Sequence, residues 1–186
     1  MRNWRNISYL LDGTERQQAA YRALRYVGIE TLLVDFDPIL VGTLPLNIDI
    51  EGSDLDILLE IPDEYQYAQV LFPYFAEYAN FRYRRKMIRN ETAWLTNFFA
   101  HGFEFELFAQ QKPTAEQVAY RHLVAEYRLL EIGGEVAREA VRELKRGGLK
   151  TEPAFAEYFR IDGTDPFDAL LVLSELDDEA LQNHIR

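Results

Sequence analysis

The stretch that decides the fold is residues 38–60, PILVGTLPLNIDIEGSDLDILLE. Apolar runs at both of its ends are typical of buried strands, and Pro, Asn and Gly between them indicate an irregular connector. In the second run Asp54 and Asp56 alternate with Leu55 and Ile57. Side chains two residues apart point to the same face of a strand. We therefore expect two carboxylates on one face and two aliphatic side chains packed on the other.

A second predicted strand has the same pattern, because Glu104 and Glu106 alternate with apolar residues in FEFEL (103–107). Paired carboxylates repel one another and are desolvated on an apolar strand, so a divalent cation is the simplest compensation. The chain has no Cys and only three His. Oxygen ligands without thiolates favour Mg²⁺ or Mn²⁺. Asp54, Asp56 and Glu106 are the candidate metal ligands, with Glu104 as a fourth.

A Gly-Thr turn at residues 42–43 precedes the acidic strand. Glycine permits close approach of a phosphate to the backbone, whose N–H groups and a neighbouring hydroxyl can hold phosphate oxygens. Two cations held by carboxylates can bind the attacking and leaving oxygens of phosphoryl or nucleotidyl transfer. The candidate nucleotide-binding residues are Gly42, Thr43, Ser53, Arg82, Arg84 and Lys150.

Each of these residues also has a structural interpretation. The acidic pair on one strand could be a solvated strand surface, and Glu104 could be a salt-bridge partner on that face. Arg82, Arg84 and Lys86 share a face of the segment at 81–89, which could be a charged edge strand that prevents aggregation. His122 is most often a buried structural histidine at such a position.

The remaining pattern predicts an α+β protein: a mixed β-sheet with flanking helices and a helical C-terminal part. Thr14 and Gln17 form a capping-box pattern at the start of a helix that ends at Gly28. Further elements are expected as follows: strands at 38–43, 54–61, 81–89, 92–101 and 103–110; a helix after Pro62 that Pro73 breaks or kinks; a long helical run divided at Gly133-Gly134; and short helices capped by Thr151 and Asp165. We expect an α+β core over 1–112 and a helical part over 113–186 packed against it.

Composition limits the partners. The 186 residues carry a formal net charge of -11, which argues against a long nucleic acid as partner and favours a small-molecule or protein acceptor. The absence of Cys fits a reducing compartment. No signal-peptide pattern and no long apolar run are present, so we expect a soluble cytoplasmic protein.

The Gly-Thr turn, ten intervening residues and DLDI resemble the nucleotidyltransferase superfamily of DNA polymerase β, which implies a nucleotidyltransferase-like mixed β-sheet. Its pattern is a hydrophobic residue with Gly and Gly or Ser, then Asp-hydrophobic-Asp/Glu, with a third carboxylate on a later strand. GFEFELFA (102–109) is similar to the strand that carries this third acid in poly(A) polymerases, which implies Glu106. Thr43 replaces the usual Ser or Gly, and Glu replaces the common Asp as third acid. Across nearly its whole length, in PILVGT, SDLDI, FEFELF, AYRHLVAEYRLL and GLKTEPAFA, the chain also resembles a bacterial family of unknown function labelled DUF4269.

Three functions remain open from sequence. The resemblance implies a Mg²⁺-dependent nucleotidyltransferase that moves a nucleoside monophosphate from an NTP to an acceptor. A catalytically silent nucleotide-binding or regulatory module on the same fold is the alternative. A metal-dependent nuclease ranks last, because the usual Glu-X-Lys of such enzymes is missing from the second acidic strand.

Overall fold

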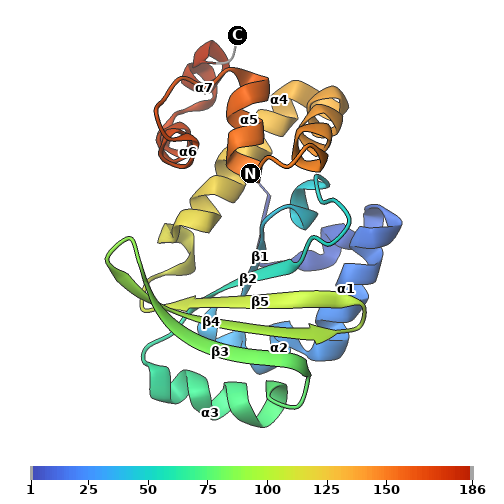
Figure 1. Ribbon diagram of the computed structural model, residues 1–186, viewed down its shortest axis with the longest axis vertical. Coiled ribbons are helices and arrows are strands. Elements are labelled where there is room, and N and C mark those ends of the chain that lie inside the picture. Colours follow the sequence, from blue (N-terminus) through green and yellow to red (C-terminus); the bar gives the residue numbers. More distant parts are fainter. Residues whose placement is uncertain (1, 185–186) are drawn as a thin grey trace. The chain divides into compact units, whose positions relative to one another are not determined.

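The computed structural model describes residues 2–184, which divide into two compact units (Figure 1). The first unit comprises residues up to Pro45 together with Ser53–Gln117. The second comprises Leu46–Gly52 and the residues from Val118 onward. The connector inside the deciding stretch therefore belongs to a different unit from the two strands that it joins. Helical packing against the core, as expected from the sequence, remains a prediction.

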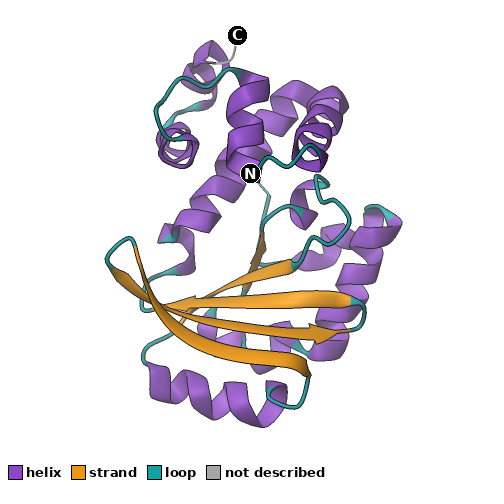
Figure 2. Cartoon of the chain, in the orientation of Figure 1, coloured by secondary structure: helices purple, strands orange, loops and turns teal. Residues whose placement is uncertain are grey.

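A five-stranded mixed sheet forms the centre of the first unit (Figure 2). Its strands, in chain order, are β1 (Ile39–Val41), β2 (Leu55–Glu60), β3 (Ala79–Ile88), β4 (Glu91–Ala100) and β5 (Phe103–Gln110). Their order across the sheet is β1-β2-β5-β4-β3, with β2 and β5 parallel and every other pair antiparallel. The predicted α+β class, the mixed sheet and its five strands are confirmed.

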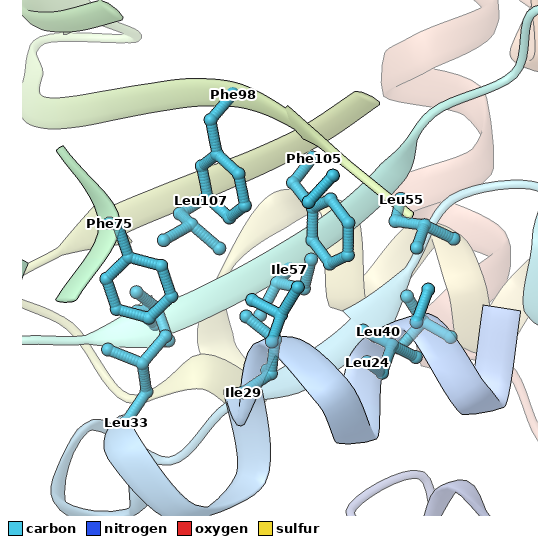
Figure 3. Close-up of a cluster of buried hydrophobic side chains, with 14 of the residues drawn as sticks. Leu24, Ile29, Leu33, Leu40, Leu55, Ile57, Phe75, Phe98, Phe105 and Leu107 are labelled. Atoms are coloured by element: carbon cyan, nitrogen blue, oxygen red, sulfur yellow. The ribbon is translucent and has the colours of Figure 1, made fainter. Parts of the chain in front are cut away.

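One face of this sheet packs against three helices, α1 (Glu15–Val27), α2 (Ile29–Leu32) and α3 (Glu64–Phe75). Figure 3 shows the resulting core, in which the strands contribute alternate residues such as Leu55, Ile57, Phe98 and Phe105. The rings of Phe98 and Phe105 stack with their centroids 4.9 Å apart. Leu55 and Ile57 are buried as predicted, so the alternate residues of β2 point to the other face.

The first helix begins and ends as its sequence predicts. Thr14 accepts a hydrogen bond from the backbone of Gln17, whose side chain accepts one from the backbone N–H of Thr14, a complete capping box. Gly28 ends the helix in the left-handed conformation, at φ 80°. Pro73 lies in the last turn of α3 and does not divide that helix. Short 3₁₀ segments complete the unit: η1 (Ile7–Asp12), η2 (Val34–Phe36), η3 (Leu44–Leu46) and η4 (Thr114–Glu116).

The second unit is helical. It contains α4 (Val118–Arg146), α5 (Thr151–Phe159), α6 (Pro166–Glu175) and α7 (Asp178–His184). Gly134 interrupts α4 with φ 64°, which confirms the expected division at the double glycine. Asp165 caps α6 by accepting a hydrogen bond from Phe167. The prediction that Thr151 caps α5 was wrong: Thr151 is the first helical residue, and Lys150 occupies the capping position without a side-chain bond.

Charged and polar side chains are buried inside this helical unit. Lys145 is 8% exposed and its ammonium donates to the carbonyl of Ile48 at 2.9 Å. His122 is buried between Glu152 and the carbonyl of Phe167, which agrees with the structural interpretation of this residue. Burial raises the pKa of Glu126 well above its usual range, with repulsion from Glu152 adding to the effect and the nearby Lys145 opposing it.

None of the helices formed by residues 2–184 combines the length and apolar character that a membrane span requires.

Candidate functional site

A row of polar residues crosses the sheet on the face opposite the hydrophobic core. Asp56 on β2 is the register partner of Glu106 on the parallel strand β5. Glu106 is in turn opposite Asn97 on β4, and Asn97 is opposite Arg82 on β3. Because neighbouring strands lie about 4.8 Å apart, the two carboxylates of Asp56 and Glu106 project from adjacent positions. The sheet thus brings together two acids that are 50 residues apart in sequence.

Glycine at position 42 is required by the carboxylate of Asp56. Gly42 follows β1 with φ 74°, in the left-handed region that side chains disfavour. A Cβ at this position would lie 2.2 Å from Oδ2 of Asp56, far inside van der Waals contact. The Gly-Thr turn and the acidic strand are therefore in direct contact.

The first turn of α1 supports both halves of this site. The side-chain amide of Gln17 donates to the carbonyl of Leu44 at 2.9 Å, directly after the Gly-Thr turn. Arg16 donates to the carbonyl of Ser53 at 2.9 Å and lies over the ring of Phe103. Ser53 and Asp54 precede β2 and are half-buried. One helix N-terminus thus fixes the chain just after the turn and just before the acidic strand.

Arg82 and Arg84 of β3 also lie on this face, and each is hydrogen-bonded to a side chain of another strand. Arg82 forms an exposed ion pair with Glu104 at 2.8 Å. Arg84 donates to Oδ1 of Asn97 at 2.8 Å. Glu104 therefore has the salt-bridge partner that its structural interpretation requires, while its role as a metal ligand stays a prediction.

The carboxylates do not form a ready-made metal cluster. Over residues 2–184, no group of three or more His, Asp or Glu side chains is arranged to hold a metal ion. The donor types still suit a hard cation, because Asp56 and Glu106 are carboxylates on adjacent strand positions. The carboxylate of Asp56 occupies the space that a side chain at position 42 would fill. Metal ligation by Asp54, Asp56 and Glu106 remains a prediction.

One predicted residue lies outside the sheet altogether. Lys150 is exposed at the start of α5, in the helical unit, whereas every other candidate is in the first unit. Its role in nucleotide binding stays a prediction.

Three residues that support this site are not among the candidates predicted from the sequence: Asn97, Arg16 and Gln17. Asn97 is a single amide in the strand ETAWLTNFFA, and a buried polar residue in such a run is a usable signal. Gln17 was recognised only as a capping residue, although the same side chain also bonds Leu44. No local pattern indicates that Arg16 reaches Ser53, because 37 residues separate them.

A family model described as "Domain of unknown function (DUF4269)" matches residues 22–173. The chain belongs to this family. The match includes the Gly-Thr turn, the acidic strand and the strand that carries Glu106, and it also extends through most of the helical unit. No curated protein matches the chain. The family assignment confirms the resemblance that the sequence motifs carry, and its description states no activity.

Solved structures with the same fold are nucleotidyltransferase-fold proteins. A structure of the GLD-2/RNP-8 complex matches with a TM-score of 0.51 and 14% identity, over 84% of this chain and 64% of that one. Cid1 poly(U) polymerase with Mg and 3'-dATP bound matches with a TM-score of 0.51 and 12% identity, over 84% and 46%. A further Cid1 structure gives a TM-score of 0.52 at 10% identity, over 84% and 48%. At these identities the likeness establishes the fold, and the chain spans between about half and 64% of these structures.

Proposed function

We propose that this protein is a Mg²⁺-dependent nucleotidyltransferase that uses an NTP as donor. The observation that carries the proposal is the contact between Gly42 and Asp56, with Glu106 as the register partner of Asp56. A phosphate-binding turn that touches a carboxylate, beside a second carboxylate, suits cation-assisted transfer of a phosphoryl-type group. Cid1 structures with MgGTP and with Mg and 3'-dATP bound support the choice of donor.

In this proposal Asp54, Asp56 and Glu106 hold Mg²⁺ or Mn²⁺ through their carboxylate oxygens. When bound, such ions neutralise the charge that develops on the α-phosphate and on the leaving pyrophosphate. The backbone N–H groups and hydroxyl of Gly42-Thr43 hold the β- and γ-phosphates. Because Gly42 has no side chain, the carboxylate of Asp56 has room beside this turn.

The reaction forms one bond and breaks one. An acceptor oxygen bonds to the α-phosphorus, the bond from that phosphorus to the β-phosphate bridging oxygen breaks, and pyrophosphate leaves. Glu106 receives or orients the proton of the acceptor hydroxyl. Arg82 and Arg84 are candidate contacts for the phosphates. The net charge of -11 favours a small-molecule or protein acceptor over a long nucleic acid.

A silent nucleotide-binding module on the same fold is the second candidate. It is favoured by the finding that no three acidic or histidine side chains within the described chain are arranged around a common cation position. Such a module would bind the nucleotide and release no pyrophosphate with any acceptor.

Thermal unfolding with Mg²⁺ and each of the four NTPs tests the nucleotide site. A ligand at 100 times its Kd stabilises the folded state by about 2.7 kcal/mol. For a chain of this size we expect a Tm increase of about 5–10 °C with at least one NTP. Asp54→Asn and Asp56→Asn should abolish the increase, whereas Glu60→Gln, on the same face at the far end of β2, should retain it. An equal increase in all variants would refute the site.

A further inference from the structure

Asn97 occupies the centre of the polar row and is nearly inaccessible to solvent, with 4% of its surface exposed. A primary amide at a buried strand position is costly unless both of its ends are hydrogen-bonded. An apolar side chain would serve strand packing better, and the flanking residues of β4 at 93–95 are apolar. The polar neighbours of Asn97 therefore explain why an amide is present at this position.

The side-chain amide of Asn97 is hydrogen-bonded to one anionic and one cationic side chain. Its Nδ2 donates to Oε2 of Glu106 at 3.1 Å, and its Oδ1 accepts from the guanidinium of Arg84 at 2.8 Å. This orientation is fixed by chemistry, because the flipped amide would put its oxygen against the carboxylate and its NH₂ against the guanidinium. Asn97 therefore has one orientation that satisfies both neighbours.

The same geometry separates Arg84 from Glu106. Arg84 is opposite Leu95 in register, so its side chain reaches diagonally to Asn97. A direct bidentate ion pair between the guanidinium and Glu106 would occupy both carboxylate oxygens and compete with a cation. With the amide between them, Oε2 of Glu106 is fixed by Asn97, and Oε1 accepts no side-chain hydrogen bond within residues 2–184.

We propose that Asn97 is a positioning residue that orients the carboxylate of Glu106 toward the cation of the nucleotide site and keeps Arg84 from pairing with it. This inference rests on the proposed function. Asn97 is not itself a metal ligand or a catalytic residue, since it acts through Glu106. Hydrogen bonds that orient a metal-binding carboxylate typically contribute 10- to 100-fold to metal affinity or activity.

Mn²⁺ binding in the presence of a non-hydrolysable NTP tests the proposal without a turnover assay, when the EPR signal of free Mn²⁺ is compared with that of the same Mn²⁺·NTP mixture without protein. Asn97→Leu removes both hydrogen bonds with a side chain of similar branched shape, and we expect the Kd for Mn²⁺ to rise about 10- to 100-fold. Asn97→Thr, which suits a strand and is too short to reach both neighbours, provides a second variant with the same expected loss. Thr96→Val is the matched control: Thr96 is the neighbouring buried polar residue of β4, points to the other face and bonds Tyr67. It should leave the Kd unchanged.

A double-mutant cycle distinguishes positioning from a general structural effect. In a Glu106→Gln background, the Asn97 substitutions should cause no further rise in the Kd. An equal rise in both backgrounds, or no rise in the wild-type background, would overturn the role of Asn97 while leaving the nucleotide site intact. Failure of the wild-type protein to bind Mn²⁺ with any NTP would instead overturn the proposed function, and the inference with it.

Discussion

Replacing Gly42 by Ala perturbs the contact on which the site depends. The new methyl group would meet Oδ2 of Asp56 at 2.2 Å, whereas ordinary van der Waals contact begins at 3.4 Å. The difference of 1.2 Å (3.4 less 2.2) is the distance by which the carboxylate or the turn must move. A misplacement of about 1 Å in a reacting group can reduce activity about 100-fold. We therefore expect nucleotidyl transfer by Gly42→Ala to fall about 100-fold, equivalent to about 2.7 kcal/mol of transition-state stabilisation.

The substitution also has a backbone cost that must be measured separately. Gly102, in the turn between β4 and β5, has a similar positive φ of 85°, and a methyl group added there would have no other atom within 4 Å. Both Gly42→Ala and Gly102→Ala should lose about 1–2 kcal/mol of unfolding free energy from the left-handed backbone. Urea denaturation measures this loss, and pyrophosphate release with the NTP found by thermal screening measures activity. Equal activity in the two variants would refute the argument that Gly42 makes room for the catalytic carboxylate.

Three further predictions concern single side chains. Gln17→Ala leaves the carbonyl of Leu44 without its side-chain donor, so we expect a loss of about 1–3 kcal/mol in urea denaturation and a higher Kd for Mg²⁺·NTP by calorimetry; an unchanged Kd would show that the turn does not need this support. Because burial raises the pKa of Glu126 above 4.5, native Glu126 holds its proton longer than the unfolded chain does, and its contribution to stability is complete below pH 4.5 and lost as the pH rises through the native pKa. In Glu126→Gln this pH-dependent loss of stability should be absent. The unfolding free energy of the variant relative to wild type should therefore rise by about 1.4 kcal/mol per pH unit between pH 4.5 and the native pKa of Glu126. A constant difference in unfolding free energy across this range would contradict the assignment. Arg82→Ala breaks only the exposed pair with Glu104 and should change the unfolding free energy by less than about 1 kcal/mol, so a larger loss would mean that the pair is structural.

Local patterns predicted those parts of the molecule that depend on local chemistry. The alternation of Leu55 and Ile57 with acids placed β2 and its two faces, and the capping box at Thr14 placed the start of α1. The double glycine at 133–134 located the interruption of α4. Each of these follows from a side-chain period or a backbone preference that a few neighbouring residues determine.

Contacts between distant segments could not be predicted in the same way. Nothing local indicates that Glu106 is the partner of Asp56 in a parallel register, because two strands and a helix intervene in the sequence. The inclusion of residues 46–52 in the helical unit depends on Lys145 and Arg142, which donate to the carbonyls of Ile48 and Asn47 from nearly 100 residues away. Thr151 was misassigned as a cap because a threonine before Glu-Pro suits both the capping position and the first helical turn.

The central claim is that Asp56 and Glu106 belong to a site that transfers a nucleoside monophosphate. The most direct measurement is the release of labelled pyrophosphate from γ-³²P-NTP with Mg²⁺ and a panel of small-molecule and protein acceptors, with transfer of the α-³²P label to the acceptor followed in parallel. We predict equimolar pyrophosphate and labelled acceptor with the wild-type protein, and neither product with Asp56→Asn or Glu106→Gln. Nucleotide binding without pyrophosphate release across the panel, or release that persists in both variants, would contradict it.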